Sequence, residues 1–151
     1  MDTLSVAIVD TVDENDGVYV GAQLLVNGVS LVDLVRQAEL PMAQQEGSPG
    51  LAGQYSWCYG TRTYMTDLRR GSKDPEDFIP MLQCPCGEPA CWPLYAWIEV
   101  GEETVTWHSF YQRHRQAGSS DKPWDYSGFG PFTFDRKQYE RALQTVLKDC
   151  E

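Results

Sequence analysis

Apolar and polar residues alternate along two pairs of neighbouring segments, in the pattern that antiparallel strands show. The first pair covers residues 4–12 and 18–26, which an acidic stretch joins. The second pair covers residues 94–100 and 104–111, which are rich in aromatic and β-branched residues and are joined by Gly-Glu-Glu. Because only a few turn residues separate the members of each pair, we predict two β-hairpins of an antiparallel sheet.

A helical periodicity covers residues 30–39, after the turn signal Asn27-Gly28. Ser30 can cap this helix, and apolar residues recur along one face. Pro41 lacks the backbone N–H that the interior of a helix requires. We therefore predict a helix over residues 30–39 that Pro41 ends.

A stronger helical pattern covers residues 135–149. Asp135 is a capping residue, and Gln138 completes the spacing of a capping box. The apolar face of this helix consists of Tyr139, Ala142, Leu143, Val146 and Leu147. Directly before the helix, Phe132 and Phe134 alternate with small or polar residues, which predicts a brief strand.

The middle of the chain has weaker patterns. Tyr55, Trp57 and Tyr59 alternate with other residues, which predicts a short strand. The sequence Asp74-Pro75-Glu76-Asp77 is typical of a helix start, and Pro80 limits that helix to a turn.

Strands and helices do not alternate regularly along the 151 residues, and no internal repeat divides them. A chain of this length buries one hydrophobic core. We predict a single domain, residues 1–151, of the α+β class.

The charge balance narrows the classes of partner, because 22 acidic residues against 12 basic ones give a net charge of −10. Such a chain repels phosphates, so we expect neither direct nucleic-acid binding nor membrane binding. A basic protein partner is permitted, and solubility alone is the alternative explanation of the acidity. The first ten residues, MDTLSVAIVD, have no basic region and no long apolar run, so we expect a cytoplasmic protein.

Three of the five cysteines, Cys84, Cys86 and Cys91, lie within the stretch CPCGEPACW. Thiolates and imidazoles are the usual ligands of structural zinc, which binds four of them in a tetrahedron. If residues facing each other across the second hairpin have numbers that add up to 204 or 205, His114 lies opposite Cys91. The sequence therefore indicates one structural zinc with His114 as the fourth ligand, with Cys58 as an alternative. Three buried thiols in the core are the other interpretation.

No nucleophile–base motif, deaminase motif or phosphate-binding loop is found. A metal-dependent enzyme would therefore have to use the cysteine cluster, with Glu88 and His114 beside the metal. That enzyme is our alternative hypothesis, and it requires an accessible pocket next to the metal.

The remaining candidate chemistry consists of aromatic and basic side chains. A partner-binding face could be formed by Tyr55, Trp57, Tyr59, Trp124 and Tyr126, since Tyr and Trp dominate interface hot spots. The alternative is that these residues belong to the core, where we also place Trp92, Trp97 and Trp107. The run Arg113-His114-Arg115 is either an anion clamp or a set of partners for the surplus of acidic residues.

Five stretches resemble a family of small bacterial proteins, mainly of actinobacterial type. These stretches are VNGVSLVDLVRQAELP, LAGQY, CPCGEPACWPLYAWI, VTWHSFYQRHR and WDYSGFGPFTFDRKQYERAL. The resemblance implies a bacterial, stand-alone, single-domain protein, and it transfers no activity and no functional residue.

We predict a small acidic binding protein that docks on a larger basic partner, such as a toxin or nuclease, in the way that immunity and inhibitor proteins do. A toxin-like gene directly upstream would favour this hypothesis over a metal-dependent enzyme.

Overall fold

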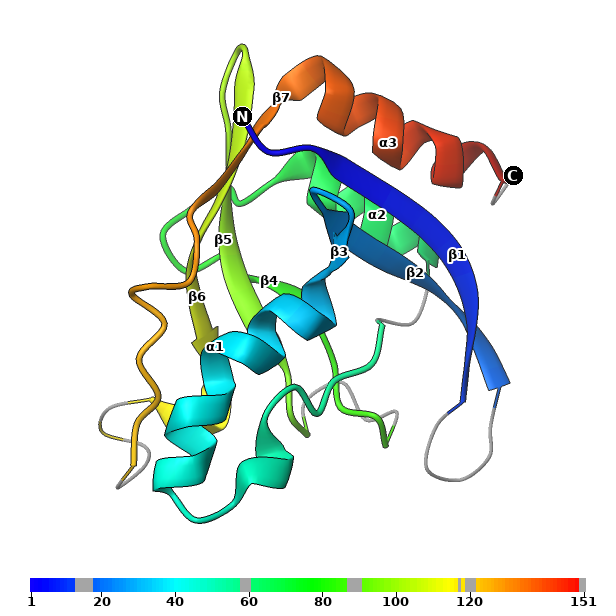
Figure 1. Cartoon of the computed structure of the whole chain (residues 1–151). Coiled ribbons are helices and arrows are strands. Elements are labelled where there is room, and N and C mark those ends of the chain that lie inside the picture. The colour runs from blue at the N-terminus through cyan, green and yellow to red at the C-terminus, as the bar shows by residue number, and fades with distance from the viewer. Residues whose placement is uncertain (13–17, 58–60, 87–90, 117, 119–121, 150–151) are drawn as a thin grey trace.

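The computed structural model describes the chain apart from a few short segments, which Figure 1 draws in grey. These segments are residues 13–17, 58–60, 87–90, 117, 119–121 and 150–151. Over the described residues the chain forms two antiparallel sheets and three α-helices, which confirms the α+β class.

The first predicted hairpin is formed by β1 (Leu4–Val12) and β2 (Val18–Val26), with the predicted bounds. The residues of the two strands face each other without interruption along their whole length. The turn Asn27-Gly28, in which both residues have positive φ, then leads into β3 (Val29–Ser30) at the edge of β2.

The second sheet has the order β4 (Ile79–Leu82), β5 (Leu94–Val100), β6 (Thr104–Gln112) and β7 (Phe132–Asp135). The hairpin β5–β6 and the brief strand β7 are those that the sequence predicts. The two hairpins belong to different sheets, which a backbone bridge between the start of the chain and β7 connects.

The helix α1 (Leu31–Gln45) begins where the sequence predicts, but it continues past Pro41, so its predicted end is wrong. Pro41 lies at an exposed position, whereas Val35 before it and Ala43 after it are fully buried. Packing of this continuous face therefore outweighs the backbone hydrogen bond that proline cannot donate. The side chain of Ser30 makes no capping hydrogen bond.

The helix α2 (Thr61–Arg70) is not predicted by the patterns above. Its buried side chains include Tyr64, Met65 and Leu68, which are spaced so that they share one helical face. The segment lacks a proline that would mark its start, and its residues outside this face are polar. The buried face is therefore recognisable only from its packing in the core.

The helix α3 (Arg136–Asp149) confirms the strongest helical pattern. The backbone N–H of Gln138 donates to the Asp135 carboxylate over 3.0 Å, which is the predicted cap. The capping box is not closed, because the Gln138 side chain donates to the Leu4 carbonyl at 2.6 Å and accepts from the Leu4 N–H at 3.1 Å. These two bonds attach α3 to β1, which runs beside it in Figure 1.

Two short elements differ from the prediction. Asp74 forms a turn and not a helix, since its carboxylate accepts from the Glu76 N–H over 2.9 Å and Pro80 already lies in β4. The predicted aromatic strand is reduced to a single backbone bridge at Ser56, and Tyr59 lies outside the described residues.

The centre of the core joins β6, α3 and α2 through buried hydrogen bonds. The Trp107 indole N–H donates to the Tyr139 hydroxyl at 3.1 Å, and this hydroxyl donates to the Leu68 carbonyl at 2.7 Å. Burial raises the pKa of Tyr139, which keeps the hydroxyl protonated as a donor. Trp107 is a core residue as predicted, whereas Trp92 and Trp97 are only half-buried.

Candidate functional site

The three clustered cysteines lie between the end of β4 and the start of β5, and the structure brings them together. The sulfur atoms of Cys84, Cys86 and Cys91 lie within 4.8 Å of one another, which is close enough to bind a metal ion. Sulfurs on one tetrahedral zinc are separated by about 3.8 Å, because each Zn–S bond is about 2.3 Å long. Cys84 is buried, Cys86 is half-buried and Cys91 is exposed, so the cluster reaches from the core to the surface.

Burial determines the protonation state of the Cys84 thiol. Burial, with a smaller contribution from the neighbouring Cys86 side chain, raises the pKa of the Cys84 thiol to about 12. The Cys86 N–H also donates to the Cys84 sulfur over 3.4 Å. Without a cation, the buried sulfur is therefore a neutral thiol, and a bound metal would have to displace its proton.

His114, the predicted fourth ligand, lies near the cluster but is not among the described residues that form it. Its ring stacks on the Trp92 indole with centroids 5.7 Å apart and an angle of 10°. Trp92 directly follows Cys91 in the chain. The stacking contact therefore shows that the hairpin brings His114 next to the cysteine loop. The fourth-ligand role remains a prediction, and so does that of Cys58, which lies outside the described residues along with Glu88.

The register explains why His114 arrives there. Residues of β5 and β6 whose numbers add up to 205 face each other from the turn as far as Trp97 and His108. The pairing then shifts by one residue, so that Tyr95 faces Tyr111. Ser109 lies in this bulge and has a φ of 57°, which is uncommon for a residue with a Cβ atom.

Arg115, from the predicted basic run, is occupied by partners within the protein. Its guanidinium lies 4.9 Å from the ring centroid of Trp92 and 5.6 Å from that of Trp124. It also pairs with Glu46 at 3.0 Å, and the Trp124 indole donates to the same carboxylate at 3.1 Å. Intramolecular pairing, one of the two interpretations of this run, is therefore the correct one for Arg115.

A buried carboxylate network lies beside this group, and the sequence does not indicate it. Glu39 of α1 has no exposed surface and accepts hydrogen bonds from the hydroxyls of Tyr55 and Tyr126 and from the N–H of Gly53. The Gln112 amide, at the end of β6, donates to Tyr55 at 3.0 Å. Burial raises the pKa of Glu39, although the three hydrogen bonds oppose this shift.

These contacts contradict the prediction of an aromatic binding face, because they bury most of its residues. Tyr55, Trp57, Trp124 and Tyr126 are only 7–8% exposed, so they form core and buried network and offer little surface to a partner. Tyr59 lies outside the described residues. The hydrogen bonds to Glu39 and Glu46 are the physical reason that such polar aromatics can be buried.

A different set of aromatic residues occupies the outer face of the second sheet. These residues are half-buried and comprise Phe78, Tyr95, Trp97, His108 and Tyr111. Their rings contact one another: Tyr95 stacks on Tyr111 at 5.2 Å, Phe78 meets Tyr111 edge-on at 4.9 Å, and Trp97 lies 5.5 Å from His108. We call this set the outer aromatic face. The alternation in residues 94–111 is the signal that could have identified it, because strand residues two apart share a face.

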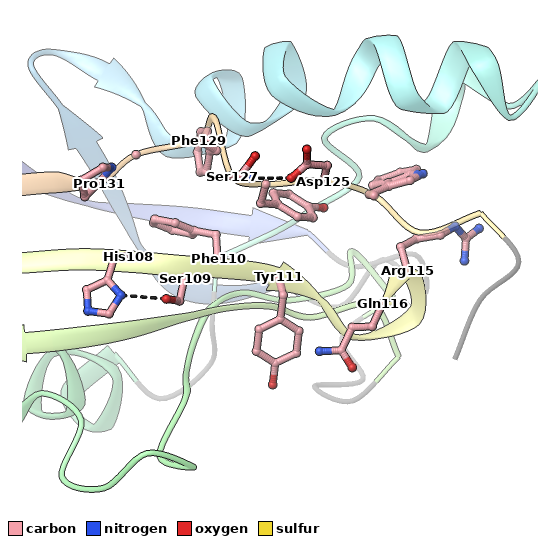
Figure 2. Close-up of a pocket in the computed structure, with 13 residues that line it drawn as sticks. His108, Ser109, Phe110, Tyr111, Arg115, Gln116, Asp125, Ser127, Phe129 and Pro131 are labelled. Atoms are coloured by element: carbon pink, nitrogen blue, oxygen red, sulfur yellow. Dashed lines mark hydrogen bonds between the residues drawn. The ribbon is translucent and has the colours of Figure 1, made fainter. Parts of the chain in front are cut away.

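A pocket of about 380 Å³ adjoins this face where β7 separates from β6 (Figure 2). It is lined by His108–Tyr111 of β6, by Arg115 and Gln116, and by Trp124–Ser127 and Phe129–Pro131. Figure 2 shows Phe110 pointing toward Phe129, whereas His108, Ser109 and Tyr111 point to the other side of β6. The pocket and the outer aromatic face thus share His108 and Tyr111 of β6.

No family model matches the chain, and no curated protein or solved structure is similar enough to count as a match. The structure defines an α+β fold with two antiparallel sheets and a cluster of three cysteines at one strand end. Of the helices that it describes, none has both the length and the apolar composition that crossing a bilayer requires.

Proposed function

We propose that this chain is a small acidic, cytoplasmic binding protein of the immunity or inhibitor type, which docks on a larger basic protein through its outer aromatic face. The observation that carries this proposal is the set of half-buried rings on β5 and β6 that contact one another on the outer face of the second sheet. Buried Tyr and Trp side chains are the anchors of most protein interfaces, and these rings are already held in position by one another.

Charge supports a basic partner. Glu99, whose side chain is 66% exposed, flanks the outer aromatic face beside His108. The Trp97 indole N–H donates to the Asp74 carbonyl at 2.9 Å, which holds the exposed acidic turn of Asp74 and Glu76 next to the rings. With a net charge of −10, this surface would attract a basic protein and accelerate its association.

The test is a measured affinity. The tagged protein would be used to capture partners from a lysate of its source organism, and each captured protein would then be purified and titrated. We expect a basic protein whose Kd rises with salt, and whose Kd rises at least about tenfold with Trp97→Ser or Tyr111→Ser. The matched control is Val20→Ser, which alters an exposed apolar residue of the other hairpin. An acidic partner would contradict the proposal. So would a partner whose Kd for both variants equals its Kd for the original protein.

We further propose that the cysteine loop holds one structural zinc ion through Cys84, Cys86 and Cys91, with His114 as the fourth ligand. A structural role is supported by the position of the loop, because it links the end of β4 to the start of the neighbouring strand β5. A metal there would tie these two strand ends together.

Elemental analysis of untagged protein, purified without chelator, tests the metal. We expect about one zinc per chain, a loss of most of it in Cys91→Ser, a partial loss in His114→Ala, and no change in Cys150→Ser. Absence of metal in the unaltered protein would refute the zinc proposal.

A further inference from the structure

Ser109 is an outlier within a regular strand. Among the described residues, Asn27 and Ser109 are the non-glycine residues with positive φ. Asn27 lies in a tight turn with Gly28, where this conformation is expected. Ser109 has its φ of 57° in the middle of β6, at the bulge. Bulges and strained residues of this kind are concentrated at functional sites, where they redirect a side chain.

The bulge brings two neighbouring side chains to the same side of the strand. Successive residues of a regular strand point to opposite faces. In Figure 2 the hydroxyl of Ser109 and the imidazole of His108 instead lie on one side and face each other, with Oγ and Nδ1 2.8 Å apart.

The second nitrogen of the same imidazole faces a carboxylate. Nε2 of His108 lies 3.8 Å from Oε2 of Glu99, which comes from the neighbouring strand β5. The Trp97 ring, 5.5 Å from the imidazole, packs against it and limits its rotation. A hydroxyl, an imidazole and a carboxylate thus lie in series, as in serine hydrolases, but with the roles of the two imidazole nitrogens exchanged.

We propose that Ser109, His108 and Glu99 form a hydrolytic site for neutral aryl esters. Ser109 is the nucleophile and His108 is the general base through Nδ1. Glu99 is a positioning residue whose negative charge, 3.8 Å from Nε2, favours the tautomer that has its proton on that nitrogen. Tyr111, the next outward-facing residue of β6, provides a ring on which the aryl group stacks. Neutral substrates are favoured because a net charge of −10 repels anions.

The reaction balances without a cofactor. The Ser109 oxygen forms a bond to the ester carbonyl carbon while its proton moves to Nδ1 of His108. The bond to the phenol oxygen then breaks, and the departing phenolate takes that proton. Water attacks the acyl-serine in the same way, which releases the carboxylic acid and restores the hydroxyl.

The pocket lies beside the same stretch of β6, and its lining residues include His108 and Ser109. It extends from His108 and Ser109 toward Phe129 and Pro131, and the rings of Phe110 and Phe129 lie 4.8 Å apart in its wall. This inference shares Trp97, His108 and Tyr111 with the outer aromatic face. Its test uses the protein alone, so its failure is distinguishable from failure of the docking proposal.

Covalent labelling with a fluorophosphonate is the direct test. The Ser109 oxygen would form a bond to phosphorus, fluoride would leave, and the hydroxyl proton would pass through His108 to water. Mass spectrometry of the digested protein should place the label on Ser109. The label should be absent in Ser109→Gly, a variant that keeps the positive φ without strain, and present in Ser5→Ala, which alters an exposed serine of β1.

Turnover of p-nitrophenyl acetate is the second measurement. We expect hydrolysis to fall to background in Ser109→Gly and at least about a hundredfold in His108→Gln. Glu99→Gln should lower kcat and leave KM unchanged, because it acts through the imidazole and does not touch the substrate. Circular dichroism would confirm that each variant folds. Failure to label Ser109, or equal hydrolysis by the original protein and Ser109→Gly, would overturn the proposal.

Discussion

The two hairpins of this protein differ in regularity, and the candidate chemistry lies with the irregular one. The strands β1 and β2 pair without interruption, and toward their distal end Ile8 and Val20 are 41% and 49% exposed. The strands β5 and β6 contain a bulge, are joined to the cysteine loop at one end, and carry the outer aromatic face. Uniform pairing builds a scaffold, whereas a break in the pairing redirects side chains and opens a pocket.

The largest effect should come from the buried carboxylate that supports the irregular region. Glu39→Ala leaves the hydroxyls of Tyr55 and Tyr126 and the N–H of Gly53 without their acceptor, so we expect a loss of about 4 kcal/mol in the free energy of unfolding. Chemical denaturation measures it. The control Glu140→Ala removes a half-buried surface pair with Arg136 and should cost about 1 kcal/mol or less.

The same residue predicts a pH dependence. The pKa of Glu39 is raised by burial in the folded protein, so between its ordinary value and the raised value the folded state binds more protons than the unfolded state. Stability relative to Glu39→Gln should therefore increase as pH falls through this window. A difference that grows with increasing pH would contradict the assigned direction.

A core substitution in the regular hairpin should lower the free energy of unfolding without changing zinc binding or the reactivity of Ser109. Leu24→Ala removes a fully buried side chain of β2 and should cost about 3 kcal/mol. Because β2 contributes nothing to the cysteine loop or to Ser109, zinc content and serine labelling of the folded variant should be unchanged. A loss of either would show that the two hairpins are coupled.

Removal of metal should destabilise the irregular hairpin by a smaller amount. A chelator should lower Tm by about 5–10 °C in the original protein and leave Cys91→Ser unaffected. Zinc affinity should fall as pH falls, because binding must displace the proton of Cys84, whose pKa is about 12. Equal Tm values with and without chelator, in protein shown to contain zinc, would refute a structural role.

The smallest effect compares the same substitution in both hairpins. Ser5→Gly places glycine in a regular strand and should cost about 1 kcal/mol. Ser109→Gly removes the strain of a positive φ and should be neutral or stabilising by up to about 1 kcal/mol. Thermal unfolding of the two variants measures the difference, and equal losses would mean that Ser109 is not strained.

Sequence patterns predicted the elements whose signals are local. Strand alternation placed both hairpins, and the cap and apolar stripe after Asp135 placed α3. The spacing of three cysteines within eight residues also predicted a common site, and the structure brings their sulfur atoms together. The helix α2 was missed because its buried face of Tyr64, Met65 and Leu68 is embedded in polar sequence.

The candidate sites outside the cysteine loop depend on contacts between distant residues. Glu39 is buried because two tyrosines from other segments reach it, and no local rule places a carboxylate in a core. The same contacts bury Tyr55 and Tyr126, so these residues offer little surface for the binding face that the sequence suggested. The helix α1 continues past Pro41 for a related reason. Packing of its buried face in the core outweighs the low helix propensity of proline.

By itself, then, the sequence determined the α+β class, the hairpins, the capped C-terminal helix and the meeting of Cys84, Cys86 and Cys91. Alternation groups the aromatic residues of β5 and β6 by face. Only the tertiary structure decided which of these faces is outward and that Ser109, His108 and Glu99 lie in series. The physical reason is that alternation and capping act between near neighbours in the chain, whereas burial and a bulge in β6 depend on what the rest of the molecule packs against them.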